Sequence, residues 1–459
     1  MDLTLEAYLA GLRGKRVTVI GIGVSNRPLL RLLAGAGAKV TARDRKTEDQ
    51  LGDIVPRLRE WGVELVLGED YMEGIGGDVV FRTPSLRPDH PGLLAAVEQG
   101  ARLTSEMEVF FKVCPCPVIA VTGSDGKTTT TTVIAEMLRA AGKTVWLGGN
   151  IGTPLLDKAG SMKPGDVAVL ELSSFQLMTM ETSPHIAVVT NLSPNHLDIH
   201  RDMAEYVEAK CNIFKHQGRR DLVVLNYDNE ITRSLAEKAP GEVRFFSKNS
   251  LPMPGGVWLK NGQMLNNGEA VMDIADIRIP GMHNVENYMA ACAALRGLVP
   301  PEVMAKVARE FAGVEHRQEL VRELDGVRWY NDSIASSPTR TLAGLKCFPP
   351  ERIILIAGGY DKHIPFDELG RALPSGARVV LLCGATAQKI GEAVRAAPDY
   401  RPGRPEMVYF DKLDDVVAYA RNIAKPGDCV LFSPACASFD QFPNFMERGR
   451  YFKEKVNQL

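Results

Sequence analysis

The sequence has no excess of charge of either sign and no apolar run of membrane-spanning length. Its 54 Lys and Arg residues nearly balance its 56 Asp and Glu residues, which leaves a net charge of −2 over 459 residues. Without a basic field, the chain is not expected to bind nucleic acid or an anionic membrane, so any anionic ligand must be held by local groups. No stretch of 18 apolar residues occurs, and the first residues lack the apolar core of a signal peptide. We therefore expect a cytoplasmic protein that binds neither nucleic acid nor membrane, and we take it to be a monomer.

Cysteine is also scarce. Eight cysteines are too few for a disulfide scaffold, so reduced thiols are expected. Only Cys114 and Cys116 lie close together, and their spacing is not that of a zinc site. Internal repeats and low-complexity tracts are absent as well, and the composition is that of an ordinary globular protein.

Short β-branched runs alternate with helical segments from end to end, a pattern typical of α/β architecture. The first such unit predicts a strand over 16–21 and a helix over 27–36, and a second predicts a strand over 117–121 and a helix over 127–141. At about 150 residues per domain, the chain length predicts about three domains. We expect a Rossmann-like domain over 1–106, a central P-loop-type domain with a mainly parallel sheet over 107–313, and a Rossmann-like α/β domain over 314–459.

A glycine-rich turn between the second strand and its helix predicts a phosphate-binding loop. It comprises Gly123, Ser124, Asp125, Gly126, Lys127, Thr128 and Thr129. The glycines let backbone N–H groups converge on phosphate oxygens at a helix N-terminus, Lys127 can reach the β- and γ-phosphates, and Thr128 can ligate Mg²⁺. Only two residues separate Gly123 from Gly126, where the Walker pattern has four, so a surface turn with a chance lysine remains the alternative.

A second glycine signal follows the first strand. Gly21 and Gly23 are followed by Asn26 where a dinucleotide fold has its third glycine, and Asp44 lies 23 residues after Gly21, where such folds keep a ribose-binding acid. The missing glycine weakens the case for a nicotinamide dehydrogenase. A nucleotide or nucleotide-sugar site on the same fold is expected instead.

Acids and histidines gather at strand ends in the central block. Glu171 ends an apolar strand, and His196 follows another, so both are candidate ligands of Mg²⁺ on a triphosphate. His196 and His200 have the i, i+4 spacing of a zinc helix, but the glutamate of such a motif is absent and Pro194 favours a loop. From the residues alone, His200 is expected to be a surface histidine and Lys210 a solvated helix lysine.

Taken together, these motifs resemble those of the Mur ligases of peptidoglycan synthesis, and within that family its D-glutamate-adding members. The resemblance covers nearly the whole chain, and its motifs include GSDGKTT (123–129), ELSSFQL (171–177), NLSPNHLD (191–198), GMHNVENYMAA (281–291), NDSIASSPTRT (331–341), GGYDKHIPF (358–366) and SPACASFDQFPNFMERG (433–449). It implies an ATP-dependent ligase that adds D-glutamate to UDP-N-acetylmuramoyl-L-alanine through an acyl phosphate. The implied domain roles are UDP-substrate binding, ATP binding and amino-acid acceptance, in chain order.

The resemblance also implies roles for single residues. Lys127, Glu171, His196 and Lys210 would be catalytic, with Mg²⁺ held by Thr128, Glu171, His196 and a carbamylated Lys210. ATP would be held by the 123–129 loop, Asn284, Asn287, Arg317 and Asp332. Substrate contacts would come from Val24, Ser25, Asp44, Arg45, Lys46, Thr83, Asn150, Ser173, Lys362, Ser438, Phe439 and Phe445, with the last four facing D-glutamate.

The chain departs from the family pattern at three places. Ile334 stands where the family has a lysine, with Arg340 as a nearby cation that could compensate, and the turn near the uridine reads Thr83-Pro84-Ser85. The run from an acid to basic residues in the same domain reads Asp44-Arg45-Lys46. Three alternatives stay open: a related Mur ligase or folylpolyglutamate synthase-like ligase with another acceptor, a non-catalytic nucleotide switch, and a dehydrogenase.

Overall fold

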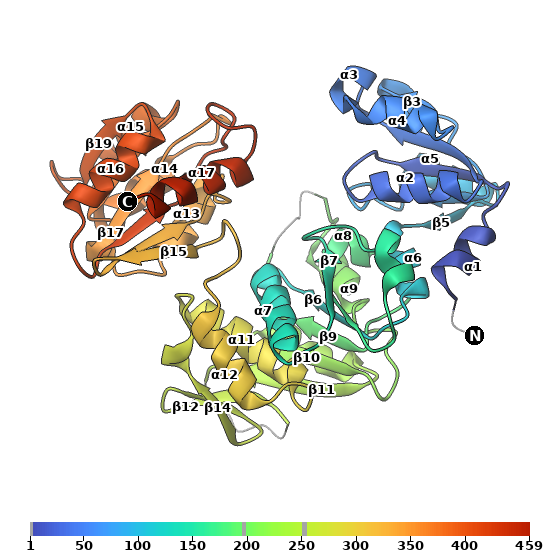
Figure 1. Cartoon of the computed structure of the whole chain (residues 1–459), viewed down its shortest axis with the longest axis horizontal. Coiled ribbons are helices and arrows are strands. Elements are labelled where there is room, and N and C mark those ends of the chain that lie inside the picture. The colour runs from blue at the N-terminus through green and yellow to red at the C-terminus, as the bar shows by residue number, and fades with distance from the viewer. Residues whose placement is uncertain (1–2, 195–198, 250–254) are drawn as a thin grey trace. The chain divides into compact units, whose positions relative to one another are not determined.

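The computed structural model describes residues 3–194, 199–249 and 255–459, which form three separate β-sheets flanked by helices (Figure 1). The chain divides into two compact units: residues 1–274 with 286–307, and residues 275–285 with 308–459. The first unit contains two sheets and the second unit contains one. The predicted three-part α/β architecture is confirmed, whereas the limits near residues 106 and 313 stay predictions. Within the described ranges, every helix is too short or too polar to cross a membrane.

The first sheet is entirely parallel, in the order β3-β2-β1-β4-β5. Its strands are β1 (Arg16–Ile20), β2 (Lys39–Asp44), β3 (Glu64–Leu67), β4 (Val79–Phe81) and β5 (Arg102–Thr104). Its helices are α1 (Leu5–Ala10), α2 (Asn26–Gly35), α3 (Glu48–Leu51), α4 (Ile54–Glu60) and α5 (Pro91–Glu98). The strand order reverses direction beside β1, the point at which Rossmann-like sheets bind nucleotides.

The second sheet has the order β14-β13-β12-β11-β10-β9-β6-β8-β7, parallel from β7 to β12 and antiparallel beyond. Its strands are β6 (Val118–Thr122), β7 (Val145–Gly149), β8 (Val167–Glu171), β9 (Ile186–Val189), β10 (Leu222–Asn226), β11 (Glu242–Ser247), β12 (Val257–Lys260), β13 (Gln263–Asn266) and β14 (Glu269–Asp273). The nearby helices are α6 (Glu106–Val113), α7 (Lys127–Ala140), α8 (Ser174–Leu177), α9 (Met203–Cys211), α10 (Glu230–Ser234), α11 (Met282–Leu295) and α12 (Pro301–Glu310). Every residue of β6 is buried, as its continuous apolar run predicts for a central parallel strand.

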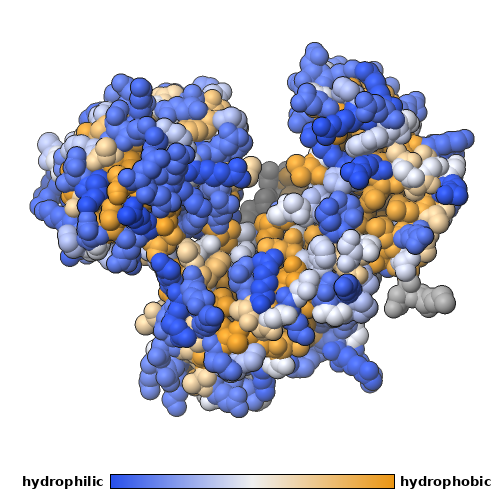
Figure 2. All heavy atoms as spheres, in the orientation of Figure 1, coloured by the Kyte–Doolittle hydropathy of each residue, from blue (hydrophilic) through white to orange (hydrophobic). Residues whose placement is uncertain are grey.

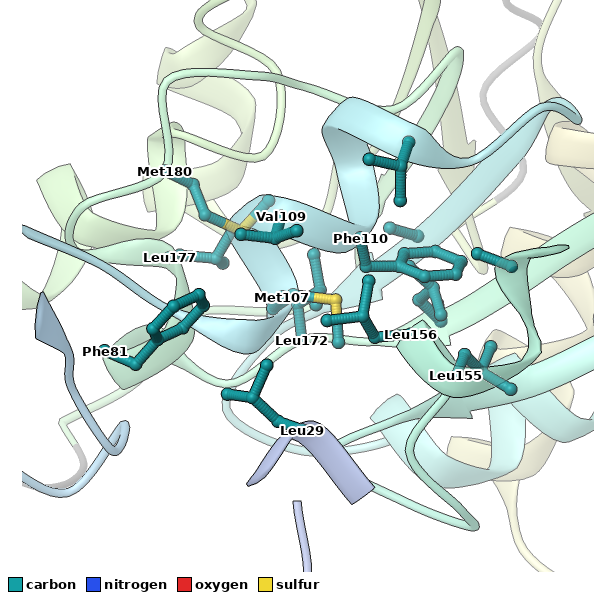
Figure 3. Packing of buried hydrophobic residues seen from close by; sticks show 14 of the residues in the cluster. Leu29, Phe81, Met107, Val109, Phe110, Leu155, Leu156, Leu172, Leu177 and Met180 are labelled. Atoms are coloured by element: carbon teal, nitrogen blue, oxygen red, sulfur yellow. The ribbon is translucent and has the colours of Figure 1, made fainter. Parts of the chain in front are cut away.

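The first two sheets and their helices contribute residues to one hydrophobic core. Leu29 of α2 and Phe81 of β4 belong to the same buried cluster as Met107 of α6 and Leu172 at the end of β8 (Figure 3). The buried guanidinium of Arg82 adds polar contacts, donating to the carbonyl of Phe175 at 3.0 Å and to other groups of the same region. This shared core explains why the first two sheets form one compact unit.

The third sheet has the order β15-β16-β20-β17-β18-β19, with β15 and β16 antiparallel and the remaining pairs parallel. Its strands are β15 (Glu319–Leu324), β16 (Val327–Asn331), β17 (Ile353–Ala357), β18 (Val379–Cys383), β19 (Glu406–Phe410) and β20 (Cys429–Phe432). Its helices are α13 (Pro338–Leu345), α14 (Asp367–Gly376), α15 (Ala387–Arg395), α16 (Leu413–Ile423) and α17 (Phe445–Asn457). Separate apolar clusters involve alternate residues of its strands, and hydrophilic side chains predominate on the visible outer face of this unit (Figure 2).

Candidate active site

The predicted phosphate loop lies between the carboxyl end of β6 and the first residue of α7. Gly123 has φ +150° and Gly126 has φ +79°, conformations that other residues rarely adopt. A Cβ atom on Gly123 would lie 1.9 Å from Oγ1 of Thr190, and one on Gly126 would lie 2.3 Å from Oδ1 of Asn287. Both positions therefore require glycine for close packing as well as for backbone conformation.

Hydrogen bonds fix this loop to the segment that follows β9. The Ser124 N–H donates to the carbonyl of Asn191 at 2.9 Å, and the Asp125 N–H donates to Oδ1 of Asn191 at 3.0 Å. The Ser124 hydroxyl is buried and lies 2.9 Å from the Tyr206 hydroxyl of α9. A plain surface turn is thus the wrong description of this loop.

Lys127 is the first residue of α7, and its ammonium folds back over the loop. It donates to the carbonyl oxygens of Gly123 and Ser124, both at 2.9 Å. The following threonines stabilise the helix start: Thr131 donates to a carbonyl of the preceding turn at 2.7 Å, and Thr130 donates to Asn287 of α11 at 3.2 Å. A helix N-terminus with an adjacent lysine offers N–H groups and positive charge to a phosphate.

Glu171, the last residue of β8, is a buried carboxylate among oxygen and amide groups. Its Oε2 accepts a hydrogen bond from the Thr128 hydroxyl at 2.7 Å, and its Oε1 accepts one from the Asn150 amide at 2.7 Å. A Cβ on Gly149 would lie 2.2 Å from the Glu171 carbonyl, so glycine is needed beside it. Carboxylate and hydroxyl oxygens are hard ligands of the kind that Mg²⁺ prefers, and these residues fit that ion.

Lys210 of α9 is buried, with only 2% of its surface exposed. Its ammonium donates to Oγ1 of Thr122 at 3.0 Å and to the Gly123 carbonyl at 2.9 Å. Burial lowers the pKa of Lys210 well below its ordinary value, and the positive charge of Lys127 lowers it further. The solvated helix lysine expected from the residues alone is therefore wrong.

His200 is also buried, which corrects the expected surface histidine. Its Nε2 lies 2.9 Å from the Ser174 hydroxyl, its Nδ1 lies 3.5 Å from a carboxylate oxygen of Glu205, and its ring stacks on Phe175. His196, a predicted Mg²⁺ ligand, falls within 195–198, outside the described residues. Among the residues that are described, no cluster of three or more His, Cys, Asp or Glu side chains could hold a metal ion.

The glycine turn after β1 is held by Asn26 and Asp44. The Asn26 amide donates to the Gly21 carbonyl at 2.8 Å, which gives a structural role to the residue standing in place of the third glycine. The Asp44 carboxylate accepts from the Ile22 N–H at 2.6 Å, and Thr83 would lie 3.0 Å from a Cβ on Gly21. The remaining predicted contacts in this turn region are exposed: Val24, Ser25, Arg45 and Lys46.

Ser173 and Asn284 make local contacts. Ser173 caps α8, accepting from the Gln176 N–H at 3.3 Å. Asn284, in the second unit, donates to the Pro280 carbonyl at 2.6 Å. Asn287, three residues later in α11, belongs to the first unit and packs on the loop through Gly126 and Thr130.

Asp332 and Arg317 belong to the second unit. Asp332 follows β16 and is buried, with Oδ2 accepting from the Ser433 hydroxyl at 2.8 Å. Burial raises the pKa of Asp332 to about 7, although the hydrogen bond from Ser433 and, more weakly, the charge of Arg317 oppose that rise. Arg340 donates to the Ile334 carbonyl at 3.0 Å, so a cation lies beside the residue that replaces the family lysine.

The two predicted acceptor loops of the third sheet pair with each other. The Gly358 N–H donates to the Pro434 carbonyl at 2.8 Å, and the Tyr360 N–H donates to the Ala437 carbonyl at 3.0 Å. The predicted residues differ in exposure: Lys362 is exposed, Ser438 is buried, Phe439 is 62% exposed, and Phe445 is half-buried at the first position of α17.

The residues from the sequence analysis thus form local groups within each unit. Lys127, Lys210 and the loop come together through the Gly123 carbonyl, and Thr128, Asn150 and Glu171 form one hydrogen-bonded group. The sequence analysis missed Tyr206 and Thr122, which hold Ser124 and Lys210. The sequence could have indicated these two residues only by their positions. Tyr206 lies one helical turn before Lys210, and Thr122 directly precedes the loop.

Comparisons with known proteins agree with this arrangement. A family model described as the Mur ligase middle domain matches residues 121–295, and one described as the Mur ligase glutamate ligase domain matches residues 316–436. The chain is 50% identical over 460 residues, covering 100% of both chains, to UDP-N-acetylmuramoylalanine--D-glutamate ligase of Clostridium novyi. UDP-N-acetylmuramate-alanine ligase of Thermotoga maritima has a similar fold, with 20% identity, a TM-score of 0.56, and coverage of 97% of this chain and 99% of that one. MurF ligase from Thermotoga maritima, solved with ADP, gives 18% identity, a TM-score of 0.55, and coverage of 98% and 97%.

Proposed function

This chain belongs to the Mur ligase family, and on that basis we propose that it is an ATP-dependent ligase joining D-glutamate to UDP-N-acetylmuramoyl-L-alanine. The observation that carries the proposal is the convergence of Lys127 and Lys210 on the Gly123 carbonyl of a glycine loop at a helix N-terminus. That loop can bind a triphosphate, and the full-length similarity to a D-glutamate ligase supports the acceptor.

The reaction proceeds in two steps. The L-alanyl carboxylate attacks the γ-phosphorus of ATP, the bond to the β-phosphate oxygen breaks, and ADP leaves. The D-glutamate amine then attacks the acyl carbon, the carbon–oxygen bond to phosphate breaks, and an amide and inorganic phosphate result with loss of a proton. Lys127 neutralises negative charge on the transferring phosphoryl group, and the N–H groups of the loop orient that group.

Mg²⁺ fits the oxygen-rich group around Glu171, and when bound it would neutralise charge on the phosphates. Thr128, Glu171 and a carbamate on Lys210 would hold it, together with His196. A carbamate turns the Lys210 cation into an anion, which removes its repulsion from Lys127 and makes the side chain a metal ligand.

The proposed division of labour follows the three sheets. Residues 1–106 bind the uridine part of the substrate through Asp44, Thr83 and their neighbours, and residues 107–313 bind ATP. Residues 314–459 bind D-glutamate, with Lys362 as the cation for a carboxylate and Ser438 as a neutral donor. Because its proposed substrates are soluble precursors, we propose that the enzyme acts in the cytoplasm, and we further propose that it is a monomer.

Phosphate release measured across candidate amino acids tests the proposal. With UDP-N-acetylmuramoyl-L-alanine and ATP, release should require D-glutamate and should be far lower with L-glutamate or a diamino acid. Release with another amino acid would assign a different acceptor within the same ligase family. ATP binding without release under any combination would favour the nucleotide switch.

A further inference from the structure

Arg448, the fourth residue of α17, is a buried arginine to which the sequence analysis gave no role. Only 4% of its surface is exposed, and among the described residues no carboxylate lies within hydrogen-bonding distance of its guanidinium. Burial lowers the pKa of Arg448 to about 10, a value at which the group still carries its charge at neutral pH. A charge kept in such a place without an ion-pair partner requires full hydrogen bonding.

The guanidinium meets that requirement with backbone carbonyls from two separate loops. Its NH1 donates to the Ala437 carbonyl at 2.8 Å, and its NH2 donates to the Cys436 carbonyl at 3.0 Å. NH2 also donates to the Ser333 carbonyl at 2.8 Å, and Nε donates to the Ser333 hydroxyl at 3.0 Å. One side chain therefore joins the segment after β16 to the segment after β20.

The same side chain lies close to the Gly359 loop and is linked through Ser333 to the start of α17. A Cβ on Gly359, in the loop that carries Lys362, would lie 2.5 Å from the Ala437 carbonyl and 3.1 Å from NH1 of Arg448. The Ser333 hydroxyl that accepts from Arg448 donates to the Phe445 carbonyl at 2.8 Å. The loops of Lys362 and Ser438 and the first residue of α17 thus meet around one guanidinium.

We propose that Arg448 is the positioning residue of the amino-acid acceptor site, holding the backbone of residues 436–438 and the neighbouring loops in the geometry that binds the acceptor. The inference rests on the proposed function. Asp332, on the ATP side, has anchors independent of Arg448: the Ser433 hydroxyl at 2.8 Å and its own N–H to the Phe432 carbonyl at 2.8 Å. Loss of Arg448 should therefore affect the acceptor more than ATP.

Lysine cannot replace the planar guanidinium of Arg448, because a single ammonium group cannot donate to three carbonyls and a hydroxyl that lie around one plane. We expect Arg448→Lys to raise KM for D-glutamate at least about tenfold while KM for ATP changes less than about threefold. The matched control is Arg322→Lys, since Arg322 donates to the carbonyls of Val456, Asn457 and Leu459 at the opposite end of the same helix. That variant should lower Tm but leave KM for D-glutamate within about twofold.

Ser333→Ala provides a second, milder variant that keeps the guanidinium and removes one of its acceptors. It should raise KM for D-glutamate in the same direction by about threefold or more. Unchanged KM for D-glutamate in a folded Arg448→Lys or in Ser333→Ala, or an equal rise for D-glutamate and ATP, would overturn the positioning role. The parent enzyme distinguishes failure of the proposed function from failure of the Arg448 proposal. If the parent does not consume D-glutamate, the proposed function is wrong. If the parent is active and the variants are unaffected, only the positioning role of Arg448 is wrong.

Discussion

The ammonium groups of Lys127 and Lys210 both lie 2.9 Å from the carbonyl oxygen of Gly123. Burial makes the charged form of Lys210 costly, and repulsion from the Lys127 ammonium adds to that cost, so the pKa of Lys210 falls. A neutral amine has the lone pair that attacks CO₂: a nitrogen–carbon bond forms and a proton leaves. The geometry that disfavours the charged form of Lys210 therefore favours the carbamate proposed above.

Lys210→Ala should therefore be nearly inactive in phosphate release, because the anion beside the proposed Mg²⁺ site is lost. Small carboxylic acids that occupy the vacated space should restore part of the rate. Lys215→Ala is the control, since Lys215 is an exposed lysine four residues beyond α9 that pairs with Glu208, and it should stay within about twofold of the parent. Full activity of Lys210→Ala without added acid would remove Lys210 from the site.

Lys127→Ala should lower kcat by about 10³-fold, equivalent to about 4 kcal/mol, because a charge that follows the transferring phosphoryl group is removed. Single-turnover phosphate release at saturating ATP measures the effect. An exposed lysine after the same helix, Lys143, serves for comparison and should tolerate alanine. Activity of Lys127→Ala within tenfold of the parent would contradict its role.

Gly126→Ala should weaken ATP binding at least about tenfold, because the new Cβ would meet Asn287. Gly142→Ala separates this clash from backbone strain. Gly142 follows the far end of α7 with a similar φ of +80°, and a Cβ there meets nothing within 4 Å. It should cost about 1 kcal/mol of stability and leave ATP binding unchanged. Equal nucleotide affinity in the two variants, measured by calorimetry, would contradict the steric argument.

Glu106 gives the fold a pH dependence outside the site. It is buried, accepts from the Leu156 N–H at 3.2 Å, and its pKa is raised by burial from 4.5 to about 7. Because the folded state holds this proton more tightly than the unfolded state, the stability it contributes is complete below pH 4.5 and is lost as pH rises through about 7. The loss is about 3 kcal/mol at most.

Glu106→Gln should remove that loss, since the amide oxygen can still accept from Leu156. Thermal unfolding at pH 5 and pH 8 should show a smaller drop in Tm for this variant than for the parent. The exposed Glu98, changed to Gln, should follow the parent. Parallel curves for Glu106→Gln and the parent would show that the carboxyl is not responsible.

Lys362→Ala should raise KM for D-glutamate about tenfold or more and KM for ATP much less. The variant removes an exposed cation that is proposed to contact D-glutamate but not ATP. Both constants are measured in the same preparation. The exposed Lys412, changed to Ala, should alter neither. An equal rise in the two constants would take Lys362 out of the acceptor site.

The elements that local patterns encode were predictable from the sequence. The apolar run of β6, the glycine turn and the start of α7 follow one another within ten residues, from Val118 to Lys127, so the strand, the loop and the helix could be predicted together. Asp44 was also placed at its strand end, where it holds the first glycine turn.

The burial of Lys210 and His200 was not predictable from the residues alone, because it depends on partners far away in the chain. Lys210 bonds Thr122, 88 residues earlier, and His200 bonds Ser174, 26 residues earlier. A lysine within a polar helix has no local feature that reveals such partners. The family resemblance implied the role that we propose for Lys210. The reason for Asn26 became clear only from the carbonyls to which its amide donates.

The core common to the first two sheets determines where the chain can be cut. A fragment ending near residue 106 would keep Leu29 and Phe81 but lose Met107 and Leu172, which belong to the same buried cluster in the full chain (Figure 3). Newly exposed apolar surface of this kind favours aggregation. The N-terminal nucleotide-fold portion is consequently not a transferable module: grafted onto another protein, it would need a substitute for the apolar face that the central portion supplies.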